Sequence, residues 1–241
     1  MNIYRALLLK DLRHAARDPV LLALVIGPLA LLLLARFGFP VAANWLSTYM
    51  SFSLHEYRHF TAALFATTIP MLAGMMTGLM MLDERDEHLV AYYAVTPLRR
   101  GGYLRYRLLL PSLLSFILLA LFLWLSDLAA WRAESALALL LLALEAPGFG
   151  LFLAACSANK VEGLALSKLG GLFIAGPLVA EFVPGGWQLL AAPLPTYWPA
   201  RLLLTDDGAA TLHAYGPFII GLTLHIALLV WLRRSFLIRS D

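Results

Sequence analysis

The stretch PVLLALVIGPLALLLLA, residues Pro19–Ala35, decides the fold class because it contains no Asp, Glu, Lys or Arg. A helix that crosses a bilayer core needs roughly 20 consecutive apolar residues. The charged lead before this stretch, residues 1–18, carries both signs and is too long and too acidic for the start of a signal peptide. We therefore predict a retained first membrane span that follows a short helix.

The rest of the chain repeats this composition. The 241 residues are 61% hydrophobic and only 14% charged, with a mean hydropathy of +0.78, whereas soluble domains are nearer half apolar and a quarter charged. Five further spans are predicted at Phe60–Leu82, Leu108–Ser126, Ser135–Ser157, Leu169–Val183 and Ala214–Leu232. We expect an all-α integral membrane protein with six transmembrane helices, residues 1–241 forming a single transmembrane domain. Cys156 is the sole cysteine, which excludes an internal disulfide.

The basic residues are distributed unevenly between the two sides. With six spans, only Arg36, Arg58, Arg132 and Arg201 of the 18 lysines and arginines fall on the side opposite the termini. Cytoplasmic loops of membrane proteins carry the excess of Lys and Arg. The pattern predicts that both termini are cytoplasmic.

The lead segment, residues 1–18, has an amphipathic pattern. Tyr4, Leu8, Leu12 and Ala15 form one stripe, and Asp11 lies near it. On the opposite side of the predicted helix are Lys10, Arg13 and Arg17. This favours an interfacial helix before the first span; the alternative is a segment that only fixes the topology.

The second cytoplasmic segment, residues 83–107, is predicted to contain a short amphipathic helix. Leu89, Tyr92, Tyr93 and Thr96 fall at i, i+3, i+4 and i+7, and Pro97 ends the helix. The acids Asp83, Glu84, Asp86 and Glu87 are expected in its first turn, with Glu84 and Glu87 on the polar side. The alternatives for the apolar face are the membrane surface and the chain's own bundle. Because acidic residues are unfavourable beside anionic lipid, we favour a protein partner.

The outer connection, residues 184–214, is rich in aromatic residues and proline. Trp187, Tyr197 and Trp198 are typical of the membrane–water interface. We expect short half-inserted helices that cap the outer end of the bundle.

Two kinds of chemistry-bearing residue stand out. Residues 55–59, HEYRH, match the HExxH spacing with which His55 and His59 could bind zinc and Glu56 act as base, and the nearest third ligand by topology would be Asp127 or Asp206. A polar helix start is the alternative. Glu145, Glu181 and His225 lie within predicted spans, where ionisable groups usually face a bundle interior or a path, and they are the candidate substrate path. For His225 a hydrogen-bonded core histidine, and for Glu181 a position at the outer surface, are the alternatives.

The chain has no P-loop, because its lysines follow Leu9, Asn159 and Ser167 rather than glycine. Taken together, these features resemble the permease subunits of type-2 ABC exporters. The most specific stretch is LDERDEHLVAYYAVTPLRRGGYLRYR, residues Leu82–Arg107, supported by Arg17-Asp18-Pro19 and by PLPTYWP at 193–199. Many members have Gly-Thr where His88-Leu89 stands. NKVEG at 159–163, with Ala165 and Lys168, is similar to the bacterial subgroup of fluoroquinolone-export permeases.

The resemblance implies a transport subunit with no catalytic site of its own in a bacterial cytoplasmic membrane. It implies two partner ATP-binding subunits that bind ATP and Mg²⁺, a second permease copy or a sister permease, and contact with lipid but not with nucleic acid. Glu84, Glu87, Leu89, Tyr92, Tyr93, Thr96 and Pro97 would then couple to the ATPase, and Lys10, Arg13 and Arg17 would belong to the connecting helix. Two alternatives stay open, a membrane zinc protease using His55, Glu56 and His59 and an ion-coupled carrier using Glu145 and His225.

Overall fold

The computed structural model describes residues 3–205 and 212–239, and the regular elements of this part are all helices. Six segments are long and apolar enough to cross a membrane, which confirms the predicted fold class. They are Pro19–Met50, Leu54–Asp86, Arg99–Leu125, Ala133–Cys156, Lys160–Phe182 and Ala214–Ile238.

The first half of the chain forms the lead helix and three spans. The elements are α1 (Ile3–Arg17), α2 (Pro19–Leu33), a π-helical turn η1 (Leu34–Gly38), α3 (Phe39–Met50), a 3₁₀ turn η2 (Leu54–Tyr57), α4 (Arg58–Asp86), α5 (Leu89–Ala94) and α6 (Arg99–Leu125). The predicted end of the first span at Ala35 is wrong. Arg36 pairs with Asp127 from the turn after α6, so its charge does not stop the helix, which continues through η1 and α3.

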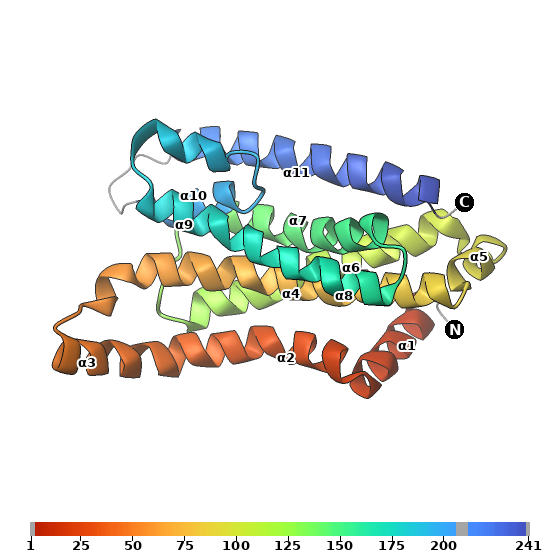
Figure 1. Ribbon diagram of the computed structural model, residues 1–241, viewed down its shortest axis with the longest axis horizontal. Coiled ribbons are helices and arrows are strands. Elements are labelled where there is room, and N and C mark those ends of the chain that lie inside the picture. The colour runs from red at the N-terminus through yellow and green to blue at the C-terminus, as the bar shows by residue number, and fades with distance from the viewer. Residues whose placement is uncertain (1–2, 206–211, 240–241) are drawn as a thin grey trace.

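The second half forms three spans and the outer connection. The elements are α7 (Ala133–Cys156), α8 (Lys160–Ser167), a 3₁₀ helix η3 (Lys168–Ile174), α9 (Ala175–Phe182), a 3₁₀ helix η4 (Gly185–Ala191), α10 (Tyr197–Leu203) and α11 (Leu212–Arg239). The fifth span is thus α8, η3 and α9 in sequence. Figure 1 shows the described ends of α1 and α11 at the same end of the bundle, together with α5.

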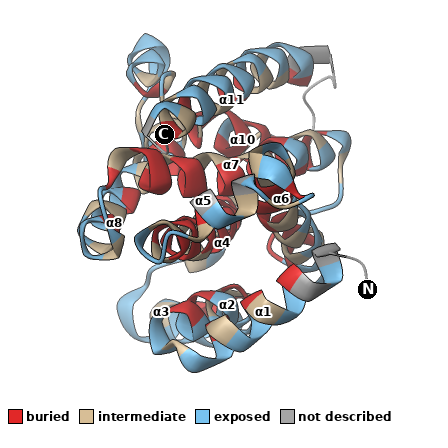
Figure 2. Ribbon diagram, turned by 90° about the vertical axis from the view of Figure 1, so that its right-hand side faces the viewer, coloured by how far each residue is buried: buried red, intermediate tan, exposed pale blue. Residues whose placement is uncertain are grey.

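Helices α4 and α7 form the centre of the bundle. In the most apolar 18-residue stretch of each span, 61% of the residues are buried in the span of α4 and 67% in α7, against 17% in α11. They approach closely because glycines face each other across the contact: a Cβ on Gly74 would lie 2.4 Å from the Ala146 carbonyl oxygen, and one on Gly78 would lie 2.9 Å from that of Gly150. Small residues four apart are a common way to pack helices in lipid. Figure 2 shows this buried centre end-on, with α2 and α3 at its periphery.

The outer connection departs from the expectation for its aromatic residues. Trp187 in η4 is exposed, as expected for an interface residue, but Tyr197 and Trp198 in α10 are buried, 0% and 4% exposed. They pack in the same cluster as residues of α4, α7 and α11. Helix α10 therefore fills the outer half of the core instead of lying on the membrane surface. Residues 206–211 of the predicted 184–214 segment, including Asp206, lie outside the described residues.

Candidate functional site

The acids of residues 83–87 close α4 and do not open the next helix. Asp83, Glu84 and Asp86 belong to the last turn of α4, Glu87 caps it, and α5 begins only at Leu89. The predicted position of these acids in a first turn is therefore wrong. Acids at a helix C-terminus oppose the helix dipole, so their charges need compensation from elsewhere in the chain.

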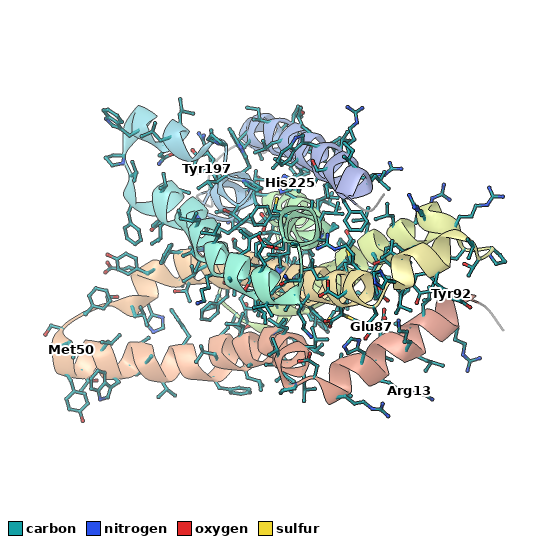
Figure 3. The ribbon with its side chains drawn as sticks, turned by 45° about the vertical axis from the view of Figure 1, so that its right-hand side comes forward. Arg13, Met50, Glu87, Tyr92, Tyr197 and His225 are labelled. Atoms are coloured by element: carbon teal, nitrogen blue, oxygen red, sulfur yellow. The ribbon has the colours of Figure 1, made fainter. Side chains whose placement is uncertain are left out.

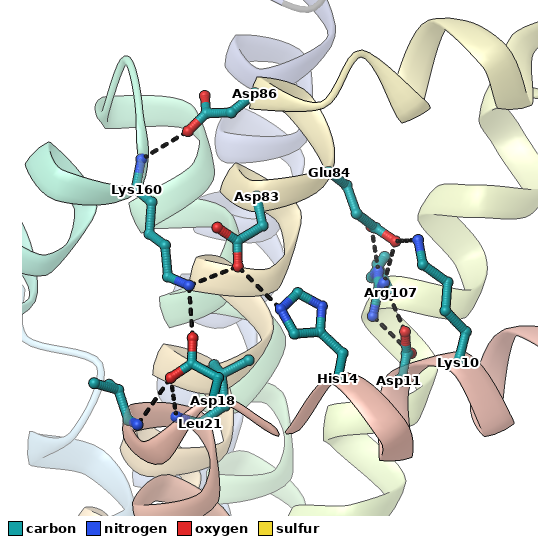
Figure 4. A network of polar contacts seen from close by, with 11 residues as sticks. Lys10, Asp11, His14, Asp18, Leu21, Asp83, Glu84, Asp86, Arg107 and Lys160 are labelled. Carbon is teal, nitrogen blue, oxygen red and sulfur yellow. Dashed lines mark hydrogen bonds and ion pairs between the residues drawn. The ribbon is translucent and has the colours of Figure 1, made fainter. Parts of the chain in front are cut away.

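Arg107 of α6 provides that compensation for Glu84. Its guanidinium donates through Nε and Nη2 to Glu84 at 3.0 and 2.6 Å, and through Nη1 and Nη2 to Asp11 of α1 at 2.8 and 3.0 Å. Tyr103 donates to Glu84 at 2.9 Å and Tyr106 to Asp11 at 2.7 Å. Figure 4 shows Lys10, Asp11, Glu84 and Arg107 of this arrangement. We call its six members the inner network: Lys10, Asp11, Glu84, Tyr103, Tyr106 and Arg107.

The inner network is buried and balanced in charge. Asp11, Glu84 and Arg107 are 6%, 3% and 2% exposed, and Lys10 supplies a second positive charge by donating to Glu84 at 3.3 Å. Buried ions are tolerated where they are paired and their hydrogen bonds are satisfied. The prediction that Glu84 lies on the polar side of the short helix is wrong, because Glu84 belongs to α4 and its carboxylate is enclosed between α1, α4 and α6.

A second cluster lies beside the inner network. Lys160 at the start of α8 donates to Asp18 at 2.7 Å and to Asp83 at 2.8 Å, and His14 Nε2 lies 3.4 Å from Asp83 Oδ2. We call these four residues the edge network (Figure 4). His14, Asp18 and Asp83 are close enough to share a cation, but the Lys160 ammonium already contacts both carboxylates. The edge network therefore acts as a set of ion pairs that fastens α1, α4 and α8 together.

Asp18 also begins the first span. Its Oδ1 accepts hydrogen bonds from the amides of Val20 and Leu21 at 2.8 and 3.2 Å, and Pro19 occupies the first helical position, an ordinary N-terminal cap. The hydrogen bond from Lys160 lowers the pKa of the Asp18 carboxyl below its ordinary value, outweighing partial burial, and the two amides act in the same direction.

The faces of α1 differ from the predicted ones. Ala15 is buried, while Leu8 and Leu12 of the predicted stripe are exposed and line a groove with Asp11. The side chain of Tyr4 is not described. Lys10 was predicted on the same exposed side as Arg13 and Arg17, but it reaches Glu84 and Tyr93, at 3.3 Å each. Arg13 and Arg17 are exposed.

The charged contacts also set the protonation of Lys10. Partial burial acts to lower its pKa, but the Glu84 carboxylate and the Tyr93 hydroxyl outweigh this effect, so the pKa of Lys10 is raised above its ordinary value. The ammonium therefore stays charged over the whole neutral range.

Helix α5 divides the predicted apolar face in two. Tyr93 turns inward: its hydroxyl accepts a hydrogen bond from Lys10, and its ring stacks on that of Tyr103 with centroids 5.5 Å apart. Tyr92 turns outward, 64% exposed, next to Val95 at 85%. Of the other predicted coupling residues, Leu89 is half-buried, Glu87 and Pro97 are exposed, and the Thr96 hydroxyl donates to the carbonyl of Tyr93. Figure 3 shows Arg13, Glu87 and Tyr92 at one end of the bundle and Met50 at the other.

His88 occupies the turn between α4 and α5. Its φ of 58° is left-handed, a region that glycine adopts at no steric cost. This geometry explains why a glycine suits the position, and the turn forms here with histidine in its place.

Glu145 and His225 meet inside the bundle. Glu145 lies midway along α7 and His225 midway along α11, and Glu145 Oε1 is 3.8 Å from His225 Nε2. Both residues line a cavity of about 250 Å³ with otherwise mainly apolar walls. Glu181, the third residue of the predicted path, is exposed near the end of α9 and does not line this cavity.

The HExxH stretch has no zinc-site geometry among the described residues. His55 lies in the 3₁₀ turn η2, whereas His59 lies in α4, and the described groups of metal-binding side chains do not include either. The His55 ring packs edge-on against Phe39, and His59 Nε2 accepts from Arg58 at 3.2 Å. Asp127 is paired with Arg36, and Asp206 lies outside the described residues.

Comparison with known proteins relates the chain to one family of membrane permeases. The profile of the Rv2686c-like fluoroquinolones export permease proteins matches residues 11–233. The chain belongs to this family. The matched residues of this chain include the edge network, the residues that line the Glu145–His225 cavity and every member of the inner network except Lys10.

Curated relatives support the assignment. The fluoroquinolones export permease proteins Rv2686c and MT2760, from two strains of Mycobacterium tuberculosis, are each 27% identical to the chain over 226 residues, which cover 92% of this chain and 88% of the relative. No solved structure matches significantly. The six apolar spans and the family membership make the chain a multi-pass membrane protein and a permease.

Proposed function

We propose that this chain is the membrane subunit of an ATP-driven exporter that moves hydrophobic or amphipathic, drug-like compounds out of the cytoplasm. The names of its curated relatives support drug export. The chain carries no P-loop, so ATP and Mg²⁺ would bind to separate ATP-binding subunits, two per complex, which act on a pair of permeases.

The observation that carries the proposal is the position of α5. This short helix presents Tyr92 and Val95 to solvent at the end of the bundle that holds the described ends of α1 and α11 (Figure 3). On its other side Tyr93 contacts Lys10 and Tyr103, members of the inner network. A push on α5 therefore reaches α1, α4 and α6 through packed and hydrogen-bonded side chains, a physically continuous route between a partner and the spans.

Partner capture tests the docking face. In membranes of the native host, Tyr92→Ala combined with Val95→Ala should reduce the amount of ATP-binding subunit that copurifies with the tagged chain, and export should fall with it. Ile238→Ala, the same kind of change at a residue of α11 that is 76% exposed, is the matched control and should leave both unchanged. A wild-type chain that emerges from mild detergent without any P-loop ATPase would refute the proposal.

A second variant separates docking from transmission. Tyr93→Phe keeps the ring that stacks on Tyr103 and removes the hydroxyl that accepts from Lys10. The ATP-binding subunit should still copurify, while the amount of compound exported per ATP hydrolysed should fall. If this variant exports as much compound per ATP as the wild type, the inner network does not transmit motion from α5 to the spans.

The Glu145–His225 pair favours a second candidate function, an ion-coupled carrier, because paired ionisable groups within spans are typical of proton relays. Transport by membrane vesicles under a pH gradient, without ATP, distinguishes the two. The proposed exporter should show no such transport, and a carrier should show it in full.

A further inference from the structure

The cavity beside Glu145 and His225 has the character of a ligand site at mid-span. It has a volume of about 250 Å³ and lies between α7, α11, η3 and the Pro193–Pro195 segment. Its aromatic lining consists of Phe149, Phe152, Phe173 and Trp231. Largely apolar pockets with a few convergent polar groups are typical of small-molecule sites.

Each of the two ionisable residues in this cavity has one polar atom without a hydrogen bond. Glu145 Oε1 and His225 Nε2 are buried and have no partner among the described residues, and the two side chains are only 4% and 2% exposed. An unsatisfied buried polar atom costs about 1–3 kcal/mol, and more if it is charged. A ligand that satisfies both atoms would recover that free energy.

The hydrogen bonding of His225 determines what such a ligand must offer. His225 Nδ1 lies 2.7 Å from the carbonyl oxygen of Gly221, one turn earlier in α11, and therefore carries a proton. In the neutral imidazole Nε2 is then an acceptor, as is the Glu145 carboxylate. With Glu145 ionised and His225 neutral, the cavity presents two acceptors 3.8 Å apart and one negative charge, within walls that offer apolar and aromatic contact.

We propose that this cavity binds the primary or secondary ammonium group of an amphipathic compound that has an aromatic or apolar body. One such ammonium carries at least two N–H groups, enough to donate to Glu145 and His225 together, and its charge matches the carboxylate. The aromatic walls favour both the body and the cation. A carboxylate ligand would meet like charge, and a hydrocarbon would leave both acceptors unpaired. This inference rests on the proposed export function in taking the bound amine to be cargo.

Equilibrium dialysis on the purified full-length chain in mild detergent tests the proposal directly. The probes are 1-naphthylmethylamine, its N-methyl, N,N-dimethyl and N,N,N-trimethyl derivatives, and neutral 1-naphthylmethanol. The number of N–H groups falls from three to none across the charged series. The primary and secondary amines should bind at least tenfold more tightly than the trimethyl derivative, with the dimethyl derivative in between.

Matched variants show whether Glu145 and His225 are responsible. Glu145→Gln should weaken binding of the primary and secondary amines at least tenfold and leave naphthylmethanol binding unchanged. His225→Phe should remove the advantage of the secondary over the tertiary amine. Glu181→Gln neutralises an exposed acid outside the cavity and should change neither measurement.

Equal binding across the methylated series, or unchanged amine binding in Glu145→Gln, would overturn the inference. If Glu145→Gln fails to give a monodisperse protein, the methylated series on the wild-type chain decides alone. Dialysis needs no ATP-binding subunit. A measured binding of amines would therefore remain valid even if the chain proved not to be an ATP-driven exporter. A failure of amine binding likewise leaves the partner-capture experiment intact.

Discussion

At the scale of single residues, Arg107 joins three helices in the inner network. Its guanidinium is 2% exposed and forms four hydrogen bonds with carboxylates of two other helices, Asp11 and Glu84. Arginine suits this position because its planar guanidinium has five N–H groups and makes four hydrogen bonds to the two carboxylates here, whereas a lysine ammonium has only three N–H groups.

Replacement of Arg107 tests how much its four hydrogen bonds stabilise the folded chain. Arg107→Met leaves Asp11 and Glu84 as neighbouring buried anions, so we expect a loss of about 3–5 kcal/mol in the free energy of unfolding. Unfolding of the purified chain in mixed micelles measures it. The triple variant Asp11→Asn, Glu84→Gln, Arg107→Met should recover most of the loss, and a single Arg107→Met variant as stable as wild type would contradict the assigned role.

The lowered pKa of Asp18 predicts a pH dependence of stability. Its folded-state pKa lies below the unfolded value of about 4. The stabilisation it provides is therefore fully present above about pH 4 and is lost as the pH falls through the folded-state pKa. Asp18→Asn keeps the capping ability and removes the charge. The difference in Tm between wild type and this variant should be constant from pH 7 to 5 and shrink toward pH 3; a constant difference throughout would refute the prediction.

The sequence identified individual residues better than their partners. Glu145 and His225 were recognisable because ionisable groups within spans are rare, yet they are 80 positions apart and no local pattern joins them. The same holds for Glu84. It was predicted on the polar side of a short helix, and its partners in the buried network, Arg107 and Lys10, come from other helices.

At the scale of elements, the close contact of α4 with α7 organises the bundle. Gly74→Ala places a methyl group 2.4 Å from the Ala146 backbone oxygen, so the helices must separate. We expect a destabilisation of about 1–3 kcal/mol, as for other overpacked contacts. Thermal unfolding in detergent measures the change.

Gly101→Ala is the matched control for that substitution. Gly101 is also helical, and an added Cβ there meets nothing within 4 Å. The control should be neutral or stabilising by up to about 1 kcal/mol, because alanine favours helix. If both variants behave alike, the close approach of α4 and α7 does not govern stability.

Composition was sufficient to place the six spans, because a bilayer demands length and apolarity and little else. Composition did not predict which polar and aromatic residues are buried, because it does not show which hydrogen bonds and ion pairs they form. The helical backbone of α4 continues past Leu82 because cations from distant elements pair with Asp83 and Glu84. Asp86 accepts a hydrogen bond from the backbone amide of Lys160 at 3.2 Å. Likewise Trp198 is compatible with the core because its indole donates to the Ala192 carbonyl at 2.9 Å.

At the scale of the whole molecule, the positions of α8 and η4 predict which side each faces. Cysteine labelling tests this arrangement in a Cys156→Ser background, which removes the sole native thiol. Val161→Cys and Trp187→Cys replace side chains that are 77% and 71% exposed. A membrane-impermeant maleimide should label Trp187→Cys on intact cells and Val161→Cys only after permeabilisation. The reverse pattern would invert the predicted topology.

The 3₁₀ segment η3 has a consequence for how the fifth span matches the thickness of the membrane. Its seven residues rise about 2.0 Å each instead of about 1.5 Å, so they reach about 3.5 Å further than the same residues wound as α-helix. The 23 residues of Lys160–Phe182 thus cover the distance that an α-helix covers with about 25. The span gains its reach from a change of winding rather than from added residues, and Phe173, on that stretched segment, forms part of the cavity wall.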